Sequence, residues 1–281
     1  MRIQKAITNT GMASRREAEV IIQEGRVTIN GSVVYHPGTD VDPSKDTILI
    51  DGMPIKSEQS PVYFLMYKPK GTITTRNDPQ NRRSVYELLE QIPYRMEPIG
   101  RLDIQTSGVL LFTNDGALAN QLTNPKLDIP KRYLVKVWKT PDARKLQRLK
   151  NGINLDDGRT KPAKVRIVEQ TDTNNAWIEI TVTEERNRLI RRMFDAVGHP
   201  ANKIKRMSFA TISLGDLESG QVRSLNGDEV RRLKDIMNGV DPQNAGHKSR
   251  YKKGYARPKP PKNKPLSKKK AKRKIKAPKR R

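Results

Sequence analysis

The chain has 281 residues and no cysteine, which excludes disulfide bonds, a thiol nucleophile and thiolate metal sites. Of its formal net charge of +26, residues 241–281 carry +17 (18 Lys/Arg and one Asp), which leaves +9 for residues 1–240. Such an excess favours a polyanionic partner, above all nucleic acid.

A small module is predicted for residues 1–60. Ser14 and Glu17 have the spacing of a capping box, which starts a helix, and Gly25 ends that helix. The Asn-Gly pair at 30–31 indicates a β-hairpin. The predicted elements are a short helix around residues 3–7, a helix at 15–24, and strands at 26–29, 32–35 and 47–50.

This module resembles the S4 RNA-binding domain, which has a Ser-Arg-Arg-Glu-Ala segment at its second helix and a Gly-x-Val segment leading to an Asn-Gly turn. Here these patterns are residues 14–18 and 25–31. The resemblance implies RNA binding, with basic side chains and helix starts facing phosphates. The candidate contacts are Arg2, Lys5, Ser14, Arg15, Arg16, Arg26 and Asn30. For any single arginine, an ordinary solvated helix face is the alternative.

Asp103 is the acidic residue of most interest in the second part of the chain. It lies between two glycines, in an irregular segment shortly before an apolar run at 109–112. Such a run predicts a buried strand, and loops beside buried strands often carry catalytic side chains. A plain Arg101–Asp103 salt bridge beside a turn is the structural alternative.

Residues 100–116 resemble motif II of the pseudouridine synthases, in the RsuA/RluB branch that modifies ribosomal RNA. The family pattern is Gly-Arg-Leu-Asp, two variable residues, Thr, a small residue, Gly, an apolar run and Thr-Asn-Asp-Gly, and every fixed position is present. The resemblance implies that Asp103 is the catalytic carboxylate, and that Arg101 holds the flipped nucleotide or fills the gap it leaves. The Asn-Asp-Gly at 114–116 also predicts a helix N-cap.

Two further segments fit this family. The Lys-Pro-Lys-Gly at 68–71 follows a predicted strand at 62–67 and resembles motif I, so Lys68 is expected near the RNA backbone or the active-site loop. Residues 131–137 alternate as a strand, and Tyr133 holds the place of the family tyrosine. The resemblance implies that its ring stacks on the target uracil and that its hydroxyl is a candidate acceptor in proton transfer. A Pro-Gly turn and a core tyrosine are the structural alternatives.

A helix with one buried face is predicted around residues 190–197, because apolar residues repeat there at helical spacing. Arg191 flanks this face. The family has Gln-(Ile/Val)-(Arg/Lys) here, whose basic residue contacts the catalytic Asp, although Leu189 replaces the Gln in this chain. The resemblance implies that Arg191 keeps Asp103 ionised, since an adjacent cation lowers the pKa of a carboxylate. The arginines expected on an outward, solvated or phosphate-facing row are Arg186, Arg188 and Arg192.

The fold class predicted from these patterns is α+β. It comprises an S4-like RNA-binding domain at 1–60, a pseudouridine synthase catalytic domain with a mixed, mostly antiparallel sheet at 61–240, and a disordered Lys/Arg-rich tail at 241–281. Other elements expected in the catalytic domain are helices at 85–91, 142–151 and 226–238, a loop at 152–160, a strand at 177–182, and segments 203–206 and 210–214 at the sheet edge.

The expected function is the isomerisation of a specific uridine in ribosomal RNA to pseudouridine. The polar loop at 75–79 looks most like the RluB-type large-subunit enzymes, which favours 23S RNA. The reaction requires no cofactor or metal, and no phosphate-binding loop, dinucleotide fingerprint or zinc spacing is found. Ribosomal RNA or a pre-ribosomal particle is the expected partner. With no apolar run of membrane-spanning length and no signal segment, we expect a cytoplasmic monomer with no membrane partner.

Two alternatives belong to other functional classes. A non-catalytic RNA-binding assembly factor on the same fold would not need Asp103, Tyr133 and Arg191 together. A nucleic-acid compactor driven by the basic tail would not explain residues 60–240.

Deleting residues 241–281 tests whether the tail acts only as an electrostatic tether. Loss of +17 should weaken RNA affinity at low salt and flatten its salt dependence, because fewer counterions are released on binding. The rate at saturating RNA should not change, because no candidate catalytic residue lies beyond Arg191. Single-turnover kinetics on a ribosomal RNA fragment at two salt concentrations separate these effects. A large drop in the saturated rate, or a shift in the modified nucleotide, would contradict a purely electrostatic role.

Overall fold

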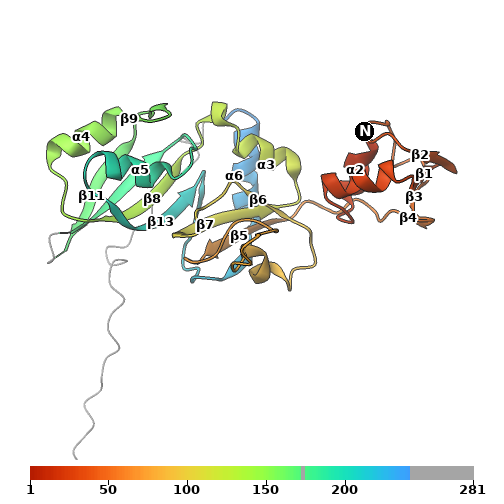
Figure 1. Ribbon diagram of the computed structural model, residues 1–281, viewed down its shortest axis with the longest axis horizontal. Helices are drawn as coiled ribbons and strands as arrows, with labels where there is room; N and C mark the ends of the chain where they lie inside the picture. Colours follow the sequence, from red (N-terminus) through yellow and green to blue (C-terminus); the bar gives the residue numbers. More distant parts are fainter. Residues whose placement is uncertain (172–174, 241–281) are drawn as a thin grey trace, which may run out of the picture. The chain divides into compact units, whose positions relative to one another are not determined.

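The computed structural model describes residues 1–171 and 175–240, so the predicted tail lies outside the described residues. The described chain contains a small sheet near the N-terminus, a large sheet and a two-stranded hairpin (Figure 1). None of the described helices is long and apolar enough to cross a membrane. The same residues hold no group of three or more His, Cys, Asp or Glu side chains that could bind a metal ion.

The small sheet and two helices enclose a core of their own. Ser14 and Glu17 form the predicted capping box at the start of the second helix. Asn30 and Gly31 have φ values of 51° and 86°, the left-handed values that a tight hairpin turn requires. In the spatial order β2-β1-β3-β4, the elements are α1 (Ile3–Asn9), α2 (Arg15–Gln23), β1 (Val27–Ile29), β2 (Ser32–Val34), β3 (Ile48–Ile50) and β4 (Met53–Pro54).

The large sheet has the spatial order β11-β12-β8-β13-β7-β5-β15, with β6 paired to β7 and β14 paired to β13. Among the described strands β13 and β7 pair in parallel, and the other pairs are antiparallel. The mixed, mostly antiparallel sheet is therefore confirmed. The strands are β5 (Tyr63–Lys68), β6 (Glu97–Ile99), β7 (Thr106–Thr113), β8 (Lys131–Val137), β11 (Lys164–Gln170), β12 (Ala176–Val182), β13 (Ala201–Phe209), β14 (Ile212–Ser213) and β15 (Val222–Ser224).

The prediction that segment 203–206 lies at the sheet edge is wrong. This segment belongs to β13, which lies between β8 and β7 in the middle of the sheet. Of its three cations only Lys203 is exposed, whereas Lys205 is half-buried and Arg206 is 1% exposed. The chain reaches this central position after helix α5, which allows the last long strand to insert beside β8 instead of adding at an edge.

A hydrophobic core lies on each face of the large sheet, because successive residues of β7 point to opposite faces. Leu110 and Phe112 belong to one core, and Val109 and Leu111 to the other. Burial on both faces explains the continuous apolar run that marked this strand. The first core also includes residues of α4 (Ala143–Asn151) and α5 (Leu189–Ala196), and the second includes residues of α3 (Gly116–Leu122) and α6 (Gly227–Met237) (Figure 1).

Two local elements differ from the prediction. The helix expected at 85–91 is a 3₁₀ helix, η1 (Val85–Leu89), and the nearby Pro93 disfavours helical backbone at the residue before it. The loop expected at 152–160 contains a small hairpin. Its strands are β9 (Asn154–Leu155) and β10 (Gly158–Arg159), and a second 3₁₀ turn, η2 (Pro125–Leu127), precedes β8.

Gly108 lies where β7 and β13 approach most closely. A Cβ on this residue would lie 2.1 Å from the backbone oxygen of Arg206 and 2.6 Å from its backbone nitrogen. Its φ of 116° is also in the range that favours glycine. Both the space and the backbone conformation therefore require glycine here.

Replacing Gly108 with Ala should destabilise the fold by about 3 kcal/mol or more, since overpacking against backbone and an unfavourable φ act together. Gly227→Ala is the matched control, because Gly227 begins α6, has no positive φ and has no atom within 4 Å of a built Cβ. Urea unfolding monitored by circular dichroism compares the two. Equal unfolding midpoints for Gly108→Ala and Gly227→Ala would show that β7 and β13 can separate at little cost.

Candidate active site

Asp103 lies in the loop before β7, and this loop is held through its backbone. The Thr74 hydroxyl donates to the carbonyl of Leu102 at 3.0 Å, and the N–H of Gly71 donates to the carbonyl of Ile104 at 2.7 Å. The N–H of Thr106 donates to the carbonyl of Asp103 itself at 2.9 Å. Within the described residues the carboxylate of Asp103 has no hydrogen bond or ion pair. The backbone of the loop is therefore held in place while the carboxylate has no partner.

Lys68 is the residue that ties β5 to this loop. Its side chain is 0% exposed, and its ammonium donates to the carbonyls of Pro69, Asp103 and Thr106 at 3.0, 3.1 and 2.9 Å. Burial lowers the pKa of Lys68 to about 8; the nearby Asp103 opposes this shift and Arg206 adds to it. Of the two places expected for Lys68, the structure has the one at the active-site loop, and full burial excludes contact with an RNA backbone.

A pocket of about 630 Å³ opens beside Asp103, within the usual size range of ligand sites, ~300–1,000 Å³. Its walls come from the Asp103 loop, from β8, and from the segment between β12 and α5. The basic residues of the wall are Arg82, Arg101, Lys131, Arg186, Arg188 and Arg191, and the acidic ones are Asp103, Glu184 and Glu185. Six cations against three carboxylates give the pocket a positive potential, which suits a phosphate-bearing ligand.

Tyr133 lines the same pocket from β8. It is 9% exposed, and the strand alternates as predicted, with Tyr133, Val135 and Val137 buried. Burial raises the pKa of the Tyr133 hydroxyl, and the Arg206 guanidinium opposes that rise. The structure therefore brings together Asp103 and Tyr133, which are thirty positions apart in the sequence.

Arg191 also lines the pocket, but the expected contact with Asp103 is not observed. Its Nη1 donates to the carbonyl of Ala201 at 2.9 Å, and within residues 1–171 and 175–240 it forms no ion pair with Asp103. Ala201 lies at a β-bulge between β13 and β8, where a carbonyl loses its regular ladder partner. The salt bridge between Arg101 and Asp103 is likewise not found among these residues, and the Arg101 side chain is exposed.

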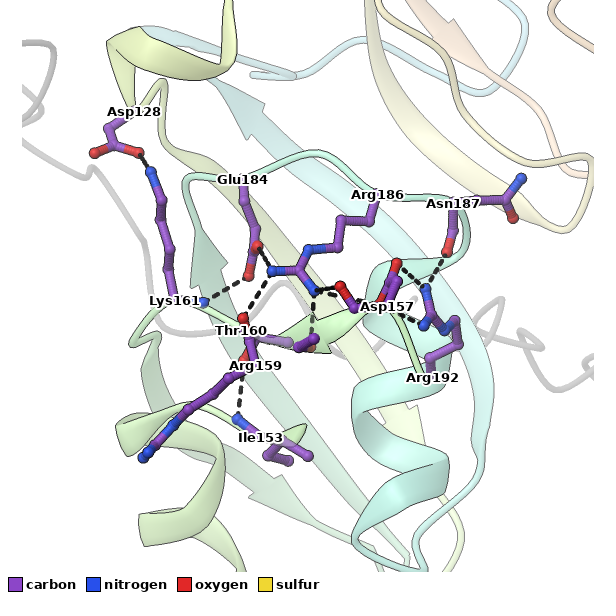
Figure 2. Close-up of polar contacts among 11 residues, drawn as sticks. Asp128, Ile153, Asp157, Arg159, Thr160, Lys161, Glu184, Arg186, Asn187 and Arg192 are labelled. Carbon is purple, nitrogen blue, oxygen red and sulfur yellow. Dashed lines mark hydrogen bonds and ion pairs between the residues drawn. The ribbon is translucent and has the colours of Figure 1, made fainter. Parts of the chain in front are cut away.

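An ion-pair network stabilises the pocket wall formed by residues 184–188 (Figure 2). Arg192 donates through both terminal nitrogens to the two carboxylate oxygens of Asp157, at 2.9 and 2.6 Å. Arg186 contacts Glu184 at 2.8 Å and donates to the backbone of the β9–β10 hairpin. Arg192, followed by Arg186, holds the pKa of Asp157 well below its usual range.

Because of this network, the prediction of an outward, solvated or phosphate-facing row is wrong for two of its three arginines. Arg186 and Arg192 are half-buried and engaged with carboxylates, so neither is free for phosphates. Arg188 differs, because it is exposed and precedes α5 with a φ of 49°, an uncommon backbone conformation for a residue other than glycine. Arg188 therefore presents an exposed cation at the pocket wall, next to the ion pairs of Arg186 and Arg192.

In the S4-like part, several candidate RNA contacts have structural roles. Ser14 caps α2, and Asn30 accepts from the backbone N–H of Thr47 and donates to Asp46. Arg26 pairs with Asp51 at 2.6 Å, and the Arg2 side chain donates to the carbonyl of Gly38. Of the candidate contacts, Lys5, Arg15 and Arg16 are exposed and form no ion pair with other described residues.

Two buried cations beside Tyr133 were not predicted from the sequence. Arg206 is 1% exposed, and Lys131 is 4% exposed with Glu185 at 3.6 Å. Both occupy inward positions of alternating strands, and a charged residue at such a position was the available signal.

Similarity to known proteins covers both parts of the chain. Residues 62–196 match the family described as RNA pseudouridylate synthase, and residues 1–48 match the S4 domain. The chain is 44% identical to "Ribosomal large subunit pseudouridine synthase B" of Bacillus subtilis (strain 168), over 83% of this chain and 95% of that protein. It is 38% identical to the protein of that name from Yersinia pestis, over 76% of this chain and 68% of that one.

A solved structure supports the same assignment. "Crystal structure of pseudouridylate synthase" matches with a TM-score of 0.59 and 28% identity, over 83% of this chain and 99% of the other. The family and the fold class predicted from the motifs are thereby confirmed. By its sequence similarity and its fold, this chain belongs to the RNA pseudouridine synthase family.

Proposed function

We propose that this protein converts a uridine of large-subunit ribosomal RNA to pseudouridine, with Asp103 as the catalytic carboxylate. The observation that carries the proposal is the Asp103 carboxylate, unpaired among the described residues, in one basic-walled pocket with Tyr133. The names of the relatives at 44% and 38% identity support the choice of RNA. With this substrate, the protein would act in ribosome biogenesis in the cytoplasm, as a monomer.

The target base must leave its stack to reach this pocket. Arg101, exposed at the pocket wall, is positioned to hold the flipped nucleotide or fill its place. Asp103 attacks the nucleotide or assists the departure of uracil, so that the bond between N1 and C1′ breaks. The uracil then rotates, C5 bonds to C1′, the C5 proton leaves and N1 gains a proton. The reaction is an isomerisation with no change of oxidation state.

The surrounding residues have distinct proposed roles. The ring of Tyr133 stacks on the uracil and its hydroxyl takes part in the proton transfer. Arg191, in the same wall, contributes positive charge to the pocket that holds Asp103. Exposed cations of the S4-like domain, at 1–60, bind phosphates outside the catalytic domain at 61–240. The candidates with no ion pair among the described residues are Lys5, Arg15 and Arg16.

A non-catalytic assembly factor on the same fold remains the second candidate. The unpaired carboxylate argues against it, because a residue kept only for structure is expected to have a partner when it lies beside so many cations. The two candidates differ in one measurable property, the conversion of uridine, and Asp103 is the residue to test.

Asp103→Asn should reduce pseudouridine formation by at least about 1,000-fold, because the amide has the same size but is neither a nucleophile nor a base. RNA affinity should stay near that of the parent. Tritium release from ribosomal RNA carrying 5-labelled uridine measures the rate. Asp195→Asn is the control, since Asp195 is an exposed carboxylate of α5 outside the pocket. Turnover of Asp103→Asn near the parent rate would contradict the assignment of Asp103 as the catalytic carboxylate.

The rate should also fall as the pH rises through about 8, because Lys68 loses its charge there and the carbonyls of its loop lose a donor. Lys68→Met should be slow and should lack this alkaline decline. The exposed Lys70 provides the control variant, Lys70→Met.

The pH dependence of the free energy of unfolding independently checks whether Lys68 is the group that titrates near pH 8. Because the folded pKa of Lys68 is depressed from 10.5 to about 8, the unfolded chain binds more protons between these values. The contribution of Lys68 to stability therefore increases as the pH rises, while the rate decreases. An alkaline decline that persists in Lys68→Met would show that another group titrates.

A further inference from the structure

A row of paired residues crosses four neighbouring strands of the large sheet. The register pairs Tyr133 of β8 with Arg206 of β13, Arg206 with Gly108 of β7, and Gly108 with Lys68 of β5. Directly paired residues point to the same face of a sheet. The side chains of Tyr133, Arg206 and Lys68 therefore share one face, and Gly108, which has no side chain, lies between the two cations.

Arg206 is the unusual member of this row. Its Nε donates to the carbonyl of Val109 at 2.7 Å, while its Nη2 is buried and has no hydrogen-bond partner among the described residues. No ion pair between Arg206 and a carboxylate is found in that part of the chain. Burying a guanidinium without a carboxylate is costly, and an unsatisfied buried donor in a native structure calls for an explanation.

The position of Arg206 suggests that its effect is exerted through Tyr133. Arg206 is not part of the pocket wall, whereas its strand partner Tyr133 is. The charged groups that influence the Tyr133 hydroxyl are Arg206 from β13, Glu185 from the segment after β12 and Asp103 from the loop before β7. Of these, Arg206 alone favours negative charge on the tyrosine oxygen, and the two carboxylates oppose it.

We propose that Arg206 is a positioning residue for Tyr133, whose guanidinium holds the tyrosine hydroxyl in place and stabilises the negative charge its oxygen carries during proton transfer. This inference rests on the proposed function. Isomerisation needs one proton to leave C5 and one to arrive at N1. Tyr133 gives its proton to N1, which kept the electron pair of the broken bond to C1′. The phenolate then takes the C5 proton, the C5–H electron pair restores the C5–C6 double bond, and the hydroxyl is regenerated.

Arg206→Met removes the charge at similar length. Single-turnover rates should be measured with the full chain on a ribosomal RNA fragment that carries 5-protio or 5-deutero uridine. Arg206→Met should be slower by about 100-fold and should show no larger isotope effect than the parent, because donation of the Tyr133 proton to N1, which forms the phenolate, becomes limiting. Arg206→Lys keeps the charge and should recover most of the rate. Lys203→Met, at an exposed position of the same strand, should stay within about twofold of the parent.

A double-mutant cycle with Tyr133→Phe locates the effect. If Arg206 acts through the tyrosine hydroxyl, Arg206→Met should cost less than about twofold in the Tyr133→Phe background. An equal loss in both backgrounds, an isotope effect larger than in the parent, or a loss in Arg206→Lys as large as in Arg206→Met would overturn the proposal. Arg206→Gln replaces Arg206→Met should the latter fail to fold.

The same experiments separate this inference from the proposed function. An Asp103→Asn variant as active as the parent contradicts the proposed function. A parent that is active, together with an Arg206→Met variant that is not slowed, overturns only the role of Arg206. A Tyr133→Phe variant at the parent rate overturns it as well, because no hydroxyl would then need positioning.

Discussion

The close parallel approach of β7 and β13 at Gly108 is the constraint on which the active-site half of the structure depends. A side chain there would collide with the backbone of Arg206. The approach places β13 between the strand that follows Asp103 and the strand that carries Tyr133. A residue without a side chain therefore helps set the distance between the carboxylate and the tyrosine, although it contacts no ligand itself.

Positive and negative side chains differ in burial around the close approach of β7 and β13. Lys68 and Arg206 are fully buried on one face of the sheet, while the Asp103 carboxylate is exposed at the pocket. Lys68 is compensated by three carbonyls, whereas Arg206 has one identified acceptor for its Nε. Charges act more strongly where water is excluded. The two buried cations therefore create a fixed positive electrostatic potential near a pocket that is proposed to bind a polyanion.

The pocket wall opposite Asp103 is stabilised by a different means. Asp157 pairs with both Arg186 and Arg192, which joins the β9–β10 hairpin to α5 and to the segment before it (Figure 2). Arginines that looked available for RNA in the sequence are used to build the wall. Arg101 and Arg188 remain exposed there. Specific recognition by this pocket therefore depends on fewer cations than the net charge suggests.

The sequence by itself determined the local elements and the identity of the family. Capping residues such as Ser14, Asp115 and Asn226, the Asn-Gly turn, and the alternation of 131–137 act over a few residues, so they can be read without a fold. The motif around Asp103 and the segment around Tyr133 likewise predicted the family and three of the pocket residues, Arg101, Asp103 and Tyr133. Only the tertiary structure decided which charged groups meet. It placed β13 at the centre of the sheet, engaged Arg191 with Ala201 and buried Arg206 beside Tyr133, because such contacts depend on strand order and register between segments far apart in the chain.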